Sequence, residues 1–249
     1  MCSAVKAIAA RSIRDRSRTK RGRSQSEAST AASLISAHAS LANLRRAASG
    51  CEACDLWKTG TQTVFGEGKS SAVVMMVGEQ PGDQEDRAGR PFVGPAGRIL
   101  DQALEEAGIE RAEVYVTNVV KHFKWSPAER GKRRIHKKPR DSEIQACRPW
   151  LDAELDAVRP KVLVCLGASA AQALLGKDFR VTRDRGKLIP SDLAPNVIAT
   201  VHPSSILRAQ DDESRQSQLE SFINDLRFVA QVIRGVQLRT ARGGDKLRA

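Results

Sequence analysis

The residues best suited to chemistry lie in a polar, glycine-rich stretch between two apolar runs. Residues 78–97 read GEQPGDQEDRAGRPFVGPAG, with Glu79, Gln80 and Asp83 near the start and Phe92 as the lone aromatic. An apolar run precedes the stretch and an amphipathic run follows it. A strand, a polar turn and a helix in this order are typical of a binding site at the carboxyl end of a strand. A solvated loop is the alternative interpretation.

A second polar stretch is strongly basic. Residues 124–140, KWSPAERGKRRIHKKPR, contain eight Lys or Arg and one Glu. Long connections in compact domains are commonly functional, and this charge favours contact with a phosphate backbone. His136 lies among these cations, which disfavour the imidazolium form and would leave the ring neutral and nucleophilic. The alternative is that His136 is an ordinary polar loop residue.

The cysteines form a third candidate site. Cys51 and Cys54 make a CxxC motif, Cys147 lies in an amphipathic segment and Cys165 ends an apolar run, whereas Cys2 is the fifth. Four thiolates can hold an Fe–S cluster or a zinc ion. An odd cysteine count without a secretion signal disfavours a disulfide framework. A redox pair for the CxxC and a buried strand cysteine for Cys165 are the alternatives.

Alternating strands and helices must position these residues. We expect strands at residues 72–77, 114–119, 161–166 and 197–201, and helices at 26–48, 96–107, 141–157, 168–175 and 213–234. This order predicts an α/β fold, a three-layer α/β/α arrangement with a central four-stranded parallel sheet. Because the carboxyl ends of parallel strands share one edge, Glu79, Asn118 and His202 should converge in one crevice.

Charge and composition divide the chain. The formal net charge is +12, and residues 1–50 hold ten Lys or Arg against two acidic residues. We therefore expect a basic, disordered arm at 1–40, a domain at 41–236 and a basic tail at 237–249. The arm is interpreted as solvated, with weak attraction to nucleic acid or an organellar transit peptide as alternatives. The sequence has no run of 18 apolar residues and therefore predicts no membrane span. We expect a monomer that acts in the bacterial cytoplasm or nucleoid.

Several of these segments together resemble a known family. GEQPG at 78–82, PFVGPAG at 91–97, TNVVKHF at 117–123, HPSS at 202–205 and the four-cysteine pattern are similar to family 4 uracil-DNA glycosylases, over residues 41–234. Gln80 within GEQPG and the inserted GKRRIH at 131–136 further resemble the UdgX branch, the uracil-DNA cross-linking glycosylases. Each motif alone would be weak, but the combination is specific.

The resemblance implies a role for each motif. Uracil flipped out of DNA would stack on Phe92 and pair with Asn118, with Gly78 and Gln80 also at the base and Asp83 lining the pocket. His202 would stabilise negative charge at uracil O2, and His136 would attack C1′ of the deoxyribose. Separately from the resemblance, we expect Glu79 to hold and polarise His136, as a carboxylate orients a catalytic histidine. DNA contacts would come from Lys132, Arg133, Arg134, Ser204 and Arg208. Cys51, Cys54, Cys147 and Cys165 would hold a structural [4Fe-4S] cluster.

The chemistry of base removal suits these residue types. Uracil must leave the base stack before a pocket can reach its glycosidic bond. Breaking that bond leaves positive charge on the sugar and negative charge on the base, which a nearby donor stabilises. A tethered histidine can then compete with water for the sugar. Two other functions stay open: a multiple-turnover family 4 glycosylase whose basic loop only binds phosphates, and a non-catalytic Fe–S or zinc module that binds nucleic acid.

Overall fold

The computed structural model describes residues 30–129, 131 and 133–245, with side chains up to residue 239. The expected N-terminal arm up to residue 29, Cys2 and Lys132 lie outside the described residues. None of the described helices is long and apolar enough to cross a membrane.

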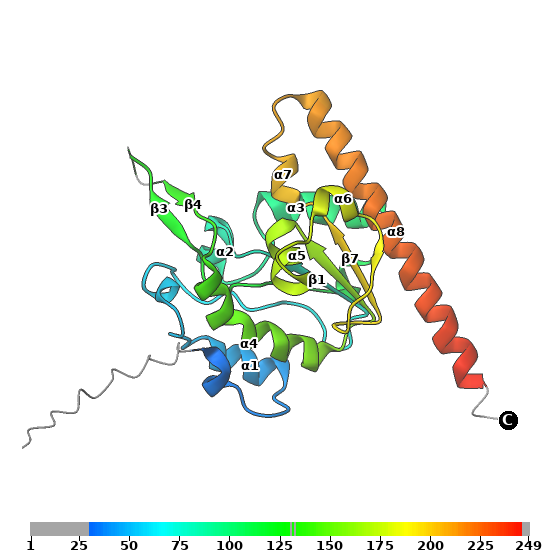
Figure 1. Ribbon diagram of the computed structural model, residues 1–249, viewed down its shortest axis with the longest axis horizontal. Coiled ribbons are helices and arrows are strands. Elements are labelled where there is room, and N and C mark those ends of the chain that lie inside the picture. Colours follow the sequence, from blue (N-terminus) through cyan, green and yellow to red (C-terminus); the bar gives the residue numbers. More distant parts are fainter. Residues whose placement is uncertain (1–29, 130, 132, 246–249) are drawn as a thin grey trace, which may run out of the picture.

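A mostly parallel sheet forms the centre of the molecule (Figure 1). Within the described residues it has five strands in the order β2-β1-β5-β7-β6. The four parallel strands are β1 (Val74–Gly78), β2 (Val114–Asn118), β5 (Val162–Leu166) and β7 (Asn196–Thr200). They confirm the expected strands to within two residues at either end, because each has a mainly apolar centre that is buried on both faces. The short β6 (Leu188–Ile189), antiparallel to β7, is an edge strand that was not predicted.

Helices cover both faces of the sheet, as expected for three layers. Along β1, Met75 and Val77 face one hydrophobic cluster and Val74 and Met76 face the other. Helices α1 (Leu41–Ala48), α4 (Asp141–Val158) and α5 (Ala168–Leu175) contribute to the first cluster. Helices α3 (Pro95–Glu106), α7 (Pro203–Ile206) and α8 (Asp212–Asp245) contribute to the second. Two short helices, α2 (Asp83–Ala88) and α6 (Val181–Asp184), flank the carboxyl edge of the sheet.

The single helix predicted over residues 26–48 does not form among the residues that the structure describes, although its last part, residues 41–48, is helical. Only η1 (Ala31–Leu34), a 3-10 helix, and α1 form there, separated by a non-helical link. The Ser40 hydroxyl accepts a hydrogen bond from the Asn43 amide at 3.3 Å, which starts α1. Ala31 is fully buried and η1 packs against α4, so ordered packing begins before residue 41.

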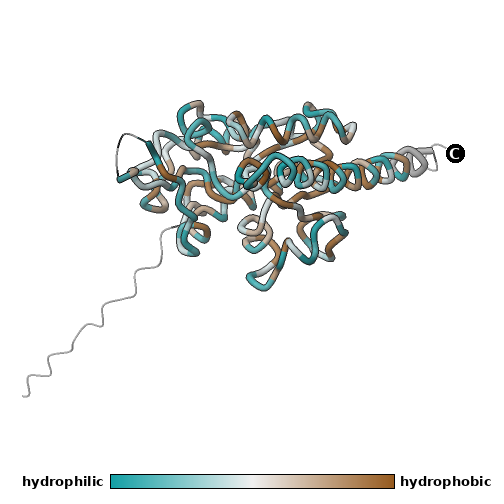
Figure 2. Tube along the Cα trace, turned by 90° about the horizontal axis from the view of Figure 1, so that it is seen from above, coloured by the Kyte–Doolittle hydropathy of each residue, from teal (hydrophilic) through white to brown (hydrophobic). Residues whose placement is uncertain are grey.

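The last helix is longer than expected. Helix α8 continues to Asp245, through most of the segment interpreted as a tail, rather than ending near residue 234. Phe222, Leu226 and Ile233 are buried, whereas Leu238 is exposed. In Figure 2, brown and teal segments alternate along α8, and its C-terminal part extends beyond the body of the molecule. The apolar face therefore docks the helix over only part of its length.

The basic segment between β2 and α4 is a hairpin rather than an irregular loop. Strands β3 (Trp125–Pro127) and β4 (Arg134–His136) pair antiparallel, with Trp125 opposite His136. The hairpin projects from the body beside α2 (Figure 1). Its pairing places His136 at the base of the hairpin, next to the carboxyl edge of the main sheet.

Candidate active site

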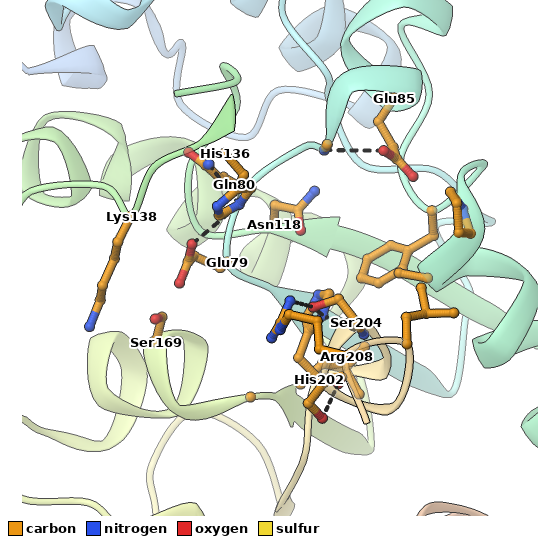
Figure 3. Close-up of a pocket in the computed structure, with 18 of the residues that line it drawn as sticks. Glu79, Gln80, Glu85, Asn118, His136, Lys138, Ser169, His202, Ser204 and Arg208 are labelled. Carbon is orange, nitrogen blue, oxygen red and sulfur yellow. Dashed lines mark hydrogen bonds and ion pairs between the residues drawn. The ribbon is translucent and has the colours of Figure 1, made fainter. Parts of the chain in front are cut away.

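The expected convergence at the carboxyl edge of the sheet is confirmed. A crevice of about 1010 Å³ is lined by Glu79, Asn118 and His202, which follow or end three different strands. Phe92 also lines it. His136 lines it too, on the side of the hairpin (Figure 3). The crevice is therefore built from β1, β2, β7 and the β3–β4 hairpin.

Gly78, the last residue of β1, lies behind the side chains of three residues that line the crevice. A Cβ atom at Gly78 would lie 2.4 Å from Asn118 Oδ1, 2.8 Å from Phe92 Cζ and 3.4 Å from His202 Nε2. Phe92 adopts a positive φ of 56°, and its ring stacks on His202 with 6.0 Å between the ring centroids. The Phe92 ring, the Asn118 amide and the His202 imidazole edge therefore lie around the α-carbon of Gly78. These three groups suit contact with a flat polar ring.

The His202 side chain is held in a defined tautomer. Its Nδ1 accepts a hydrogen bond from the Ser204 amide at 3.1 Å and lies 2.8 Å from Ser204 Oγ. Arg208 Nη1 in turn donates to Ser204 Oγ at 3.1 Å, so the hydroxyl can donate to His202. Burial lowers the pKa of His202 to about 4, with the Arg208 cation and His136 acting in the same direction. The ring is therefore neutral at pH 7, with its Nε2–H directed at the space beside Gly78.

His136 lies on the other wall of the crevice, between two residues that follow β1. Its Nε2 is 2.8 Å from Gln80 Nε2 and 3.6 Å from Glu79 Oε1. The His136 side chain is about half exposed. Partial burial lowers its pKa, the Glu79 carboxylate opposes this effect and Arg208 reinforces it. His136 is thus a mostly neutral imidazole next to a carboxylate, an arrangement that favours a nucleophile or a base.

Gln80 connects the hairpin to the crevice. Its amide nitrogen donates to the backbone oxygens of Lys124 and Lys137, at 3.2 and 3.0 Å. Its amide oxygen accepts from the Lys124 backbone nitrogen at 3.1 Å. These contacts set the orientation of the amide and hold both strands of the hairpin where they leave the body. Gln80 therefore helps to hold the hairpin that bears His136 against the crevice.

Arg134 is an internal anchor of the hairpin. Its side chain is 10% exposed and pairs with Asp83 and, at 2.6 Å, with the fully buried Asp86. The guanidinium also lies over the rings of Phe123 and Trp125, at 5.2 and 5.5 Å from their centroids. The DNA contact expected of Arg134 and the catalytic role expected of Asp83 stay predictions, and these pairings favour anchoring for both.

The remaining basic residues differ in position. Arg133 is exposed and lines the crevice, as expected of a phosphate contact. Arg208 and Ser204 line it from the opposite side, where both also support His202. Two polar residues that the sequence did not single out, Lys138 and Ser169, point toward the crevice in Figure 3.

Comparison with known proteins identifies the family. Residues 65–227 match the model of the Uracil DNA glycosylase superfamily. The chain belongs to this superfamily. It is 38% identical over 180 residues to the type-4 uracil-DNA glycosylase of Thermotoga maritima, covering 72% of this chain and 89% of that protein. The type-4 uracil-DNA glycosylases of Sulfurisphaera tokodaii (38% identical; 68% and 76% covered) and Archaeoglobus fulgidus (37% identical; 73% and 90% covered) are similar to the same extent.

The four cysteines of this superfamily member lie on one face of the sheet. Cys51, Cys147 and Cys165 are buried in the same hydrophobic cluster, and Cys54 packs against it. Burial raises the pKa of the Cys147 thiol to about 12, and Lys121 opposes this effect. Burial alone raises the pKa of Cys165, also to about 12.

The surroundings of two sulfurs suit an Fe–S cluster. Trp150 Nε1 donates to Cys51 Sγ and the Lys121 amide donates to Cys147 Sγ, each at 3.2 Å. N–H donors to the sulfurs and burial are features that tune such clusters. Among the described residues, no group of three or more His, Cys, Asp or Glu is placed to hold a metal ion. The ligand role of the four cysteines therefore stays a prediction.

Several residues that shape the site were missed from the sequence. Asp86 is fully buried and binds both Arg134 and the Thr61 amide. Lys121 and Glu154 form an ion pair inside the molecule. Charged residues are usually exposed, so their presence in an amphipathic pattern does not predict burial. For Lys121, the apolar residues on both sides in VVKHF were the one available signal.

Proposed function

We propose that this protein is a uracil-DNA glycosylase that excises uracil from DNA and becomes covalently attached, through His136, to C1′ of the resulting abasic deoxyribose. The observation behind the covalent step is the position of His136 Nε2, 2.8 Å from Gln80 and 3.6 Å from Glu79, on the wall of the crevice that contains Asn118 and His202. The type-4 relatives are named as uracil-DNA glycosylases, which supports the first part. Gln80 and the 131–136 insertion support assignment to the cross-linking branch.

Uracil recognition follows from the three side chains around Gly78. The Phe92 ring provides a stacking face and the Asn118 amide provides a hydrogen-bond donor and an acceptor. The base reaches them only after it leaves the DNA stack. Gly78 is required because any side chain there would displace the Asn118 amide and the Phe92 ring, the two groups that contact the base.

His202 stabilises the departing base. As the C1′–N1 bond breaks, its electron pair leaves with uracil and negative charge develops on the base oxygen. The neutral His202 ring donates Nε2–H toward this charge, since its Nδ1 is occupied by Ser204. A preorganised donor of this kind commonly contributes about 10²–10³ in rate.

His136 then captures the sugar. The lone pair of one ring nitrogen forms a bond to the electron-poor C1′, and the proton on the other ring nitrogen is lost to solvent or to Glu79. Partial burial keeps the ring neutral before the reaction. Attachment to a hairpin held by Gln80 and Arg134 gives the imidazole an advantage over water, because tethered groups reach effective concentrations on the order of 10⁵ M or more.

The other parts of the proposal concern DNA, cofactor and context. Lys132, Arg133, Ser204 and Arg208 contact the DNA backbone. Cys51, Cys54, Cys147 and Cys165 hold a [4Fe-4S] cluster, which stabilises the fold when bound rather than taking part in base removal. The protein acts as a monomer on uracil-containing DNA in the cytoplasm.

A denaturing gel tests the covalent step. The protein is mixed with a short single-stranded DNA that contains one uracil, and free uracil is measured in parallel. A band that survives SDS and heat is expected for uracil DNA. It should be absent for thymine DNA and for His136→Ala, and present for the control His38→Ala, which changes an exposed histidine that does not line the crevice.

The other outcomes separate the alternatives. Uracil release without a surviving band, continuing beyond one equivalent of enzyme, would refute covalent capture and indicate an ordinary multiple-turnover glycosylase. Neither a band nor released uracil, with equal binding of uracil and thymine DNA, would indicate a nucleic-acid-binding module and refute the glycosylase function.

A further inference from the structure

An ion pair is enclosed within the protein directly behind the crevice. The Lys121 side chain is 1% exposed and that of Glu154, on α4, is 0% exposed, with 2.5 Å between Lys121 Nζ and Glu154 Oε2. The ammonium also donates to Thr117 Oγ1 and to the Asn118 backbone oxygen, each at 2.7 Å. All three ammonium hydrogens therefore have acceptors.

The carboxylate of Glu154 is equally well satisfied. Its Oε1 accepts from the Gly66 amide, from Tyr115 Oη and from Thr117 Oγ1, at 2.9 to 3.0 Å. Such a pair costs much desolvation, and an apolar pair of similar volume often stabilises a fold as well or better. Stability alone thus does not explain why charged residues occupy these positions.

The segment that Lys121 anchors, residues 118–124, contacts the turn after β1 and, through Gln80, the base of the hairpin. It begins with Asn118. The Val119 and Val120 amides donate to the backbone oxygens of Gly78 and Glu79, at 2.9 and 3.0 Å. At its other end, the Lys124 amide donates to Gln80 Oε1, which holds the hairpin.

Helix α4 holds the same segment at a second point. The Lys121 backbone nitrogen donates to Cys147 Sγ at 3.2 Å, and Cys147 lies on α4 with Glu154. The side chain and the backbone of one residue are therefore both attached to one helix. A shift of Lys121 relative to α4 would move Asn118 and the backbone of Gly78 and Glu79 together.

We propose that Lys121, fixed by Glu154, is a positioning residue for uracil excision, which sets the place of Asn118 and the β1 turn relative to the flipped base. The inference rests on the uracil-release part of the proposed function and not on covalent capture. Lys121 touches no substrate. Its effect is transmitted through the Asn118 backbone oxygen and the hydrogen bonds of residues 119 and 120.

The test removes both charges at once. Lys121→Met combined with Glu154→Gln keeps similar side-chain volumes and leaves no lone buried charge. A Lys121 variant alone would leave the Glu154 carboxylate buried without its partner. Melting temperature, affinity for uracil DNA, the single-turnover rate of uracil release with excess enzyme and inhibition by free uracil are measured. The control is Arg148→Met with Asp152→Asn, an ion pair on the same helix α4 that does not line the crevice.

A positioning role predicts a specific combination of results. The double variant should stay folded and bind DNA within about twofold of the parent, because the DNA-facing side chains are unchanged. Its uracil-release rate should fall by about ten- to a hundredfold, the cost of a displacement below or near 1 Å, and free uracil should inhibit it less. The control pair should behave like the parent. A purely structural role would lower the melting temperature without a selective effect on the rate.

The contrary outcomes are equally defined. A folded double variant that releases uracil at the parental rate would overturn the proposal. If the double variant does not fold, Lys121→Gln combined with Glu154→Gln decides, because it also leaves no lone buried charge, keeps polar groups for Tyr115 and Thr117, and removes the ammonium bond to Asn118. A parental rate in that folded variant overturns the proposal as well. A parent protein that releases no uracil would refute the proposed function, and this inference with it.

Discussion

The replacement Gly78→Ala tests the location of the base pocket with a single methyl group. The added Cβ would lie 2.4 Å from Asn118 Oδ1 and 2.8 Å from Phe92 Cζ, whereas Cβ contacts below 3.0 Å are essentially never observed. The amide or the ring must therefore move by about 0.6 Å (3.0 minus 2.4) even without substrate, and the base would meet the methyl group as well. Such a displacement at a reacting centre costs on the order of 10²-fold in rate, equal to about 2.7 kcal/mol.

Thermal stability should fall as well, because the same close contacts overpack a buried site, which commonly costs about 1–3 kcal/mol. Gly78 does not have a positive φ, so alanine suits its backbone conformation and the variant should stay folded. The assay is single-turnover release of uracil from single-stranded DNA, with thermal melting in parallel. The matched control is Gly50→Ala, because a Cβ at Gly50 has nothing within 4 Å. Parental uracil release by a folded Gly78→Ala protein would refute the placement of the base against Phe92 and Asn118.

Three further predictions follow from the site. Burial lowers the pKa of His202 to about 4 in the folded protein, so the unfolded protein takes up a proton on this histidine first as pH falls below about 6.5. The melting temperature should therefore drop between about pH 6.5 and 4, and uracil release should fall near pH 4. A His202→Gln variant whose melting temperature falls as steeply would contradict this. Arg134→Met should slow cross-linking at least about tenfold more than uracil release, because it frees the hairpin that bears His136; equal losses on the gel and in the release assay would argue against anchoring. Cys147→Ala should abolish the brown colour and the absorbance near 400 nm of an Fe–S protein; a folded, coloured variant would refute the four-thiolate site.

The order of strands and helices was readable from the sequence because the signals are local. Each parallel strand has a mainly apolar centre that is buried on both faces, and the helices between them have apolar residues at helical spacing. Local interactions that compete with the predicted elements explain the two segments whose secondary structure was predicted wrongly. Ser40 caps α1 and interrupts the helix expected over 26–48, and the basic segment pairs with itself as β3 and β4. Neither event has a strong periodic signal.

The sequence by itself determined which residue types are present for chemistry and, through parallel strand order, that Glu79, Asn118 and His202 share one edge. Only the tertiary structure decided how the remaining groups are used. Arg134 looks like a DNA contact in a basic run, yet two carboxylates and two rings enclose it. Lys121 and Glu154 are 33 residues apart and pair inside the molecule. The burial and partners of a charged side chain depend on segments that meet only in the fold, so they have no local signature in the chain.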